Sequence, residues 1–273
     1  MLARSTCTAL AFVIISISCQ AQQSRLTADG VLARIQEHLA QYRTSVPNFV
    51  SDESIVSQRF VNDKLKDEVK IESSFEMKRK SGGEDVHETH IAKLVNGKIP
   101  KSQKTAMPYS FSGGVALQMA LNSTNKCFSF HRSDVPSAGN IIVIQSSPKP
   151  SASEGPSDCP SPSSNYSITA NIDPQTFQVS RVEITHDTEI NLGRIGHLRF
   201  IPSHRSDNQN IVITDVDYGP VELGEKIYWL TKSVTSELRD NDDRKNPVHL
   251  HYEAHYSNYH KFASTVTILP TDN

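Results

Sequence analysis

The chain has 273 residues, with 28 Lys and Arg against 30 Asp and Glu, a formal net charge of −2 at pH 7, and only 12 glycines. Its basic residues form no stripe with interleaved aromatics and no patch for acidic lipid headgroups, which argues against nucleic-acid and membrane-surface binding. The glycine patterns of P-loops and dinucleotide-binding folds are also absent, which excludes those nucleotide sites.

Residues 1–21 are predicted to be a signal peptide, because Arg4 precedes an apolar run from Ala9 to Ile17 that is too short to span a bilayer. Cleavage after Ala21 would release a secreted chain into the periplasm or the medium. Alternatively, the stretch "SISC" ending at Cys19 resembles the lipobox of bacterial lipoproteins, with Ser16 where Leu, Val or Ile is usual. Cleavage before Cys19 would leave the chain anchored by a lipid on that cysteine. No later window has the length and apolarity of a transmembrane segment.

The cysteines indicate one disulfide bond. Either cut removes Cys7, and cleavage after Ala21 removes Cys19 too, which leaves Cys127 and Cys159 in an oxidising compartment. The loop they would close spans 32 positions. The chain-entropy model gives such a bridge roughly 3 to 4 kcal/mol of stabilisation. A free reactive thiol is the alternative.

The first predicted elements are a helix and a long strand. Thr27 can cap a helix over residues 28–43, which Pro47 follows, and its apolar stripe comprises Val31, Leu32, Ile35, Leu39 and Tyr42. Residues 64–80 alternate between a charged parity and an apolar parity, the latter comprising Leu65, Val69, Ile71, Phe75 and Met77. Such alternation is typical of an antiparallel sheet with one wet face.

Later elements continue the β pattern. A turn at 81–83 and a partner strand over 84–98, ending at Asn96-Gly97, predict a hairpin, and a short helix is expected over 112–121. Residues 146–164 are rich in Pro and Ser and read as a surface loop within one domain. A second hairpin turns at 173–175. The further predicted strands are 127–131, 140–146, 197–201, 210–221, 226–238, 248–256 and 261–269.

Four histidines lie between residues 249 and 260. On a strand, His249, His251, Glu253 and His255 share one face, and neighbouring members could ligate a metal with residues borrowed from another strand. Residues 249 and 255 are about 20 Å apart on an extended chain, so the row cannot share one ion. We interpret it as a solvent-facing strand. A metal-assisted hydrolase using His249, His251 and Glu253 is the alternative.

Other catalytic patterns are incomplete. "HETH" at 87–90 is one residue short of the zinc-protease signature and is interpreted as surface, with Glu88 facing away from His87. Residues 239–246 lack the spacing of an EF-hand, and the G-x-S-x-G nucleophile motif is missing. The sequence therefore favours a non-enzymatic function and predicts no cofactor.

Several segments resemble large groups of uncharacterised exported bacterial proteins: "VPNFVSDE", "ITANIDPQTFQVSRVEI", "DYGPVELGEKIYWL" and "NYHKFASTVTIL". The order of one helix followed by antiparallel strands also resembles the half-barrel of outer-membrane lipoprotein-sorting carriers. That resemblance implies a concave sheet that accepts an acyl chain or another hydrophobic partner. The candidate lining residues are then Leu65, Val69, Ile71, Phe75 and Met77, with Tyr228, Trp229 and Leu230.

We therefore expect a mainly β (α+β) protein: one exported domain over 22–273, built as a curved antiparallel sheet or half-barrel with an N-terminal helix and a short second helix. The expected function is binding of a hydrophobic ligand or another component of the bacterial envelope. A purely structural surface module is a further alternative.

Overall fold

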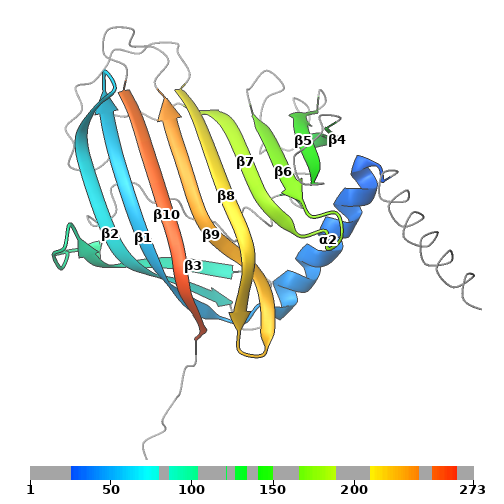
Figure 1. Cartoon of the computed structure of the whole chain (residues 1–273), viewed down its shortest axis with the longest axis horizontal. Helices are drawn as coiled ribbons and strands as arrows, with labels where there is room; N and C mark the ends of the chain where they lie inside the picture. The colour runs from blue at the N-terminus through cyan, green and yellow to red at the C-terminus, as the bar shows by residue number, and fades with distance from the viewer. Residues whose placement is uncertain are drawn as a thin grey trace, which may run out of the picture.

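The computed structural model describes residues 26–79, 86–103, 121, 127–133, 141–149, 166–188, 210–239 and 248–262. In this part of the chain one long helix accompanies ten strands (Figure 1). Their bounds are α2 Ala28–Ser45, β1 Phe49–Val61, β2 Lys64–Arg79, β3 Val86–Val95, β4 Phe128–Arg132, β5 Ile142–Pro148, β6 Ser167–Ile172, β7 Val179–Thr188, β8 Asn210–Leu223, β9 Lys226–Arg239 and β10 Val248–Lys261.

The ten strands form one curved antiparallel sheet in the order β3-β2-β1-β10-β9-β8-β7-β6-β5-β4. Two meanders, β1 to β3 and β4 to β10, are joined where β1 pairs with β10. As a result, β3 and β4 follow each other in the sequence but lie at opposite edges of the sheet. The expected fold class, a mainly β protein with a curved antiparallel sheet and an N-terminal helix, is confirmed.

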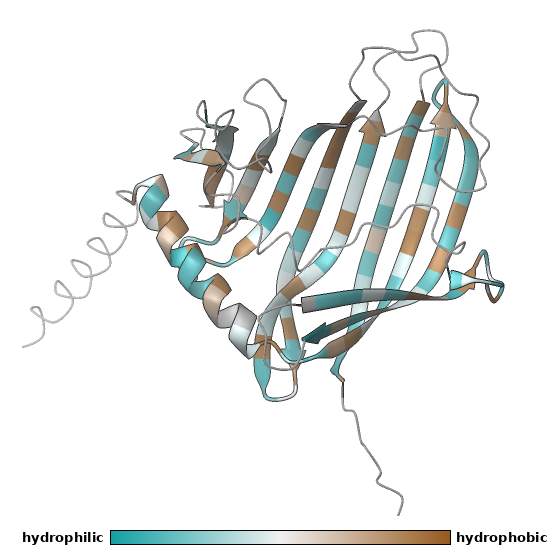
Figure 2. Cartoon of the chain, turned by 180° about the vertical axis from the view of Figure 1, so that it is seen from behind, coloured by the Kyte–Doolittle hydropathy of each residue, from teal (hydrophilic) through white to brown (hydrophobic). Residues whose placement is uncertain are grey.

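One face of the sheet carries the hydrophobic core. The strands alternate between buried and more exposed side chains, most regularly in β6, and Figure 2 shows this alternation of hydropathy along the long strands. The apolar stripe of α2 packs into the same core through Val31, Leu32, Ile35 and Leu39. A helix against a one-sided sheet buries the apolar surface of both elements, which is the main stabilising contribution.

The predicted helix over 28–43 is confirmed and extends to Ser45. The backbone N–H of Gly30 donates a hydrogen bond to Thr27 Oγ1 at 3.2 Å, so Thr27 caps the helix as expected. No helix in the described part of the chain has the length and apolarity needed to cross a membrane.

The strand predicted over 64–80 is β2, and its apolar parity is buried only in the second half. Ile71, Phe75 and Met77 are buried, whereas Leu65 is 49% exposed because the start of β2 extends past the core. β3 pairs with β2 as expected, and Asn96 and Gly97 take the positive φ values of a tight turn. The turn at 81–83 lies outside the described residues.

The second hairpin, β6 to β7, is also confirmed. Asp173 Oδ1 accepts hydrogen bonds from the N–H groups of Gln175 and Thr176, which closes the predicted turn. The prediction of a loop over 146–164 is wrong at its start, because β5 extends to Pro148 and Ser146 is a buried strand residue, while residues 150–164 lie outside the described ranges. The Ser146 hydroxyl accepts a hydrogen bond from Ile168 N–H, which explains why a serine occurs there.

Several expectations concern residues outside the described ranges. The short helix over 112–121 is described only at Leu121, which is helical and buried. The strand at 197–201, most of the strand at 261–269, the signal peptide and Cys159 also lie outside, so the Cys127–Cys159 bridge stays a prediction.

The turn between β8 and β9 requires a glycine. Gly224 has φ +68°, and a Cβ there would lie 2.7 Å from Lys261 Nζ, the flexible end of a side chain. Left-handed backbone costs an L-residue about 1 to 2 kcal/mol, so we expect Gly224→Ala to lower the free energy of unfolding by that amount in urea denaturation. Gly97→Ala should lose a similar amount, since Gly97 has φ +74° with no atom near an added Cβ, whereas Gly30→Ala is the control, since Gly30 lies in α2 without a positive φ. A Gly224→Ala protein as stable as the wild type would contradict this.

Candidate functional site

A pocket of about 360 Å³ lies between α2, the β6–β7 turn and the β8–β9 hairpin. Its apolar lining consists of Ile35, Leu39, Phe177, Val179, Tyr228 and Trp229. Its polar lining consists of His38, Ser45, Gln178 and Lys226, with Ile227 standing 72% exposed. Ligand pockets commonly combine such an apolar wall with a few polar groups, in volumes of about 300 to 1,000 Å³.

Local structure explains how these residues come together. On α2, Ile35, His38 and Leu39 are three and four positions apart and so share one side of the helix. Phe177 has φ 54° and closes the β6–β7 turn through a hydrogen bond from its N–H to Asp173 O. The Trp229 indole donates from Nε1 to Val179 O at 2.7 Å, which fixes the ring beside the turn. The pocket therefore has a largely pre-formed wall.

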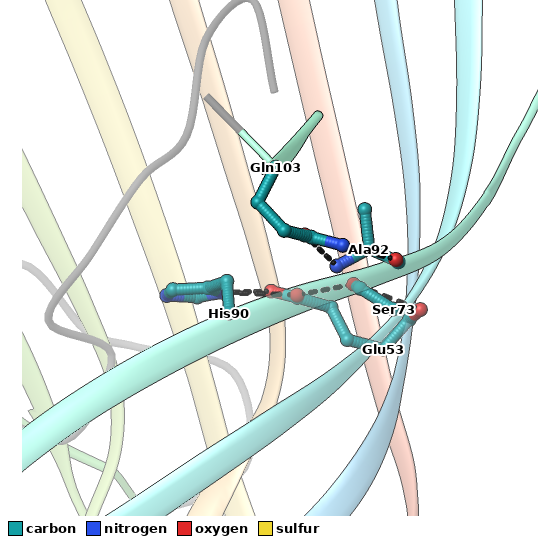
Figure 3. Close-up of polar contacts among 5 residues, drawn as sticks. All are labelled: Glu53, Ser73, His90, Ala92 and Gln103. Atoms are coloured by element: carbon teal, nitrogen blue, oxygen red, sulfur yellow. Dashed lines mark hydrogen bonds and ion pairs between the residues drawn. The ribbon is translucent and has the colours of Figure 1, made fainter. Parts of the chain in front are cut away.

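A polar cluster lies near the β3 edge of the sheet, away from the pocket. There Glu53 of β1 contacts His90 of β3 (Figure 3). His90 Nδ1 lies 2.9 Å from both carboxyl oxygens of Glu53, and Ser73 Oγ donates to Oε2 at 2.5 Å. The Glu53 side chain is fully buried and that of His90 is 9% exposed.

Sheet register places this pair. Glu53 is opposite Ser73 on β2, and His90 is opposite Phe75, so β2 separates the two interacting residues. Neighbouring strands are about 4.8 Å apart, and only a small residue such as Ser73 lets a glutamate extend over the intervening strand. Figure 3 shows Glu53 reaching past Ser73 toward His90. Beside it, the side-chain amide of Gln103 bonds the N–H and C=O of Ala92.

Aromatic rings surround the pair. Phe75 lies 5.1 Å from the His90 ring and 5.4 Å from that of Tyr256, between ring centroids. Burial raises the pKa of the Tyr256 hydroxyl well above its usual value, and the neighbouring Glu53 carboxyl raises it further. Burial likewise raises the pKa of Tyr259. Both hydroxyls therefore stay protonated through the neutral range and remain hydrogen-bond donors.

The Glu53–His90 pair corrects the interpretation of "HETH" as surface. Residues 88 and 90 face inward on β3, because they pair with the buried Met77 and Phe75, while His87 is exposed. His90 Nε2 is buried and has no hydrogen-bond partner among the described residues. A carboxyl-oriented imidazole is found in catalytic bases and metal sites, but in the described part of the chain no hydroxyl or thiol contacts His90 Nε2, and we assign the pair to structure.

The histidine row lies on the opposite, wetter face of β10. His249 and His251 lie 3.7 and 3.9 Å from Glu237 of β9, and His255 Nε2 lies 2.8 Å from Glu253. Tyr252, Ala254 and Tyr256 point to the buried face, as predicted. Within the described ranges, no group of three or more His, Cys, Asp or Glu side chains is arranged to hold a metal ion. The metal-assisted hydrolase stays a prediction.

The ligand-binding candidates from the sequence are divided between two places. Ile71, Phe75 and Met77 are buried within the core, with Val69 half-buried and Leu65 exposed on β2. Trp229 and Tyr228 line the pocket, and Leu230 is buried. Strands β1 and β10 separate β2 from β9, so the two groups do not form one site. Sequence reasoning missed His38 and Lys226, although the helical spacing of His38 from Ile35 was a usable signal.

No protein-family model matches the chain. No curated protein matches its sequence either. Among solved structures, it is similar to a DUF1329 family protein from Desulfovibrio piger, with 8% identity, a TM-score of 0.43, and coverage of 87% of this chain and 94% of that one. It is also similar to a LolA superfamily protein from Nitrosomonas europaea, with 11% identity, a TM-score of 0.33, and coverage of 88% and 96%. The weak architectural resemblance noted in the sequence is thus confirmed. A likeness this distant indicates neither ligand nor activity.

Proposed function

We propose that the protein binds a small hydrophobic ligand in the pocket beside α2. The observation that carries this proposal is the pocket itself, whose wall combines two aliphatic residues of the helix with Phe177, Tyr228 and Trp229. Ile227 stands 72% exposed at the same place. Exposed apolar surface beside a pre-formed apolar pocket favours ligand binding, because covering it removes apolar area from water and lowers the free energy of the complex.

The predicted signal peptide places this activity outside the cytoplasm, in the periplasm or beyond the cell. A protein with such a pocket there would carry or hold an apolar molecule of the envelope, without chemical conversion. The volume of about 360 Å³ is at the lower end of the range for ligand sites, which supports a ligand with a single alkyl chain.

Trp229 is the only tryptophan of the chain and lines the pocket, so its fluorescence reports binding directly. We expect octan-1-ol to change the Trp229 emission saturably. Ile227→Ser should weaken this binding about three- to tenfold, because less apolar surface is covered. Ile99→Ser is the control, since Ile99 is 83% exposed and does not line the pocket. An absent or unsaturable response in the wild-type protein would refute the proposal.

A further inference from the structure

We infer that the ligand of this pocket is an anionic single-chain amphiphile, whose acidic headgroup lies at Lys226; this inference rests on the proposed function. The lining residues include one lysine and one histidine but no Asp or Glu. Among the described lining residues, the one formal charge is therefore positive, and an acidic headgroup complements it.

Lys226 is available for a ligand. It is exposed at the start of β9, and within the described residues its side chain makes no ion pair or hydrogen bond. Glu222 and Glu225, the acidic residues nearest to Lys226 in the sequence, are not among the lining residues. Neither is Glu37, which lies next to His38 on α2 and pairs with Arg34 at 3.6 Å. The positive charge is therefore not neutralised from within the pocket wall.

His38 adds a second nitrogen group to the same lining. It is half-buried on α2, one residue before Leu39, and its imidazole has no hydrogen-bond partner among the described residues. An imidazole N–H donates readily to a carboxylate or phosphate oxygen. An amphiphile whose chain covers Trp229 and Tyr228 can thus place its acidic head against both basic groups. Carboxylate and phosphate heads share this chemistry.

The experiment compares four ligands with the same chain length: octanoate, octyl phosphate, octan-1-ol and octylamine. Trp229 fluorescence gives each dissociation constant. In the wild-type protein we expect one of the two anions, or both, to bind more tightly than octylamine, and their affinity to fall with added NaCl while that of octan-1-ol does not. The better of octanoate and octyl phosphate identifies the headgroup class.

Lys226→Met is the decisive variant. It should reduce the preference for the anion over octan-1-ol by about three- to fivefold, the range of an exposed ion pair. Lys66→Met is the matched control, because it removes the same charge from an exposed position on β2 away from the pocket. An unchanged preference in Lys226→Met, or tighter binding of octylamine, would overturn the inference. Failure of octan-1-ol to bind would instead refute the pocket itself.

Discussion

Replacing His90 with alanine is expected to lower the free energy of unfolding by about 3 to 5 kcal/mol, the usual cost of removing one partner from a buried pair. His90 Nδ1 contacts both carboxyl oxygens of Glu53 at 2.9 Å, and the Glu53 side chain has no contact with solvent. Without the imidazole, the buried carboxyl keeps Ser73 but loses its contact from β3. Urea denaturation followed by circular dichroism measures the loss.

His255→Ala is the control, because it removes an equally close contact at a more solvent-exposed position. His255 Nε2 lies 2.8 Å from Glu253, yet the two side chains are 62% and 40% exposed. An exposed pair contributes about 0 to 1 kcal/mol, so this variant should be nearly as stable as the wild type. Equal losses in the two variants would show that burial does not determine the strength of the Glu53–His90 pair.

A double variant keeps the test informative if His90→Ala does not fold. Glu53→Met combined with His90→Leu replaces both partners by apolar side chains of similar size, which leaves no unpaired carboxyl. Such replacements are often neutral for stability, and we expect the double variant to be more stable than His90→Ala. A double variant that is less stable would mean that the pair stabilises the sheet beyond the cost of its own burial.

Phe49→Ala is expected to lower the free energy of unfolding by a similar amount, about 3 to 5 kcal/mol. Phe49 is fully buried at the start of β1, with its ring 5.4 Å from that of Tyr259 and 6.0 Å from that of Phe75. It is opposite Met77 of β2, which is also fully buried. The smaller side chain leaves a cavity among residues of three strands, which the surrounding backbone can fill only in part.

Ile99→Ala serves as the surface comparison for Phe49→Ala, since Ile99 is 83% exposed and such changes usually alter stability by less than about 0.5 kcal/mol. The same denaturation experiment applies. A loss below about 1 kcal/mol in Phe49→Ala would show that the neighbouring rings close the cavity, and that the start of β1 is not a rigid part of the core.

Local patterns in the sequence were enough to predict most elements. The alternation in 64–80 predicted β2, helical spacing predicted α2, and the Asp173 turn predicted the β6–β7 hairpin. These features depend on residues only a few positions apart, so they can be predicted from the order of residues in the sequence. Alternation also placed His251 on the more exposed face of β10 and Tyr252 on the buried one.

The pairing of strands and both polar sites required the tertiary structure. Periodicity shows which face of a strand is buried but not which strand lies beside it, and β1 pairs with β10 some 200 positions away. Glu53 and His90 are 37 residues apart. Alternation alone does not predict a glutamate at a buried position of β1, because the histidine that pairs with it is distant in the sequence.

The amino-acid sequence alone specifies a one-sided antiparallel sheet with a helix, because side-chain period and turn chemistry are local properties. The contact of His90 with the buried Glu53, and the pocket that Lys226, His38 and Trp229 line together, follow only from the three-dimensional fold. These residues come from segments far apart in the chain, and their proximity arises from packing, which burial of the shared apolar surface drives.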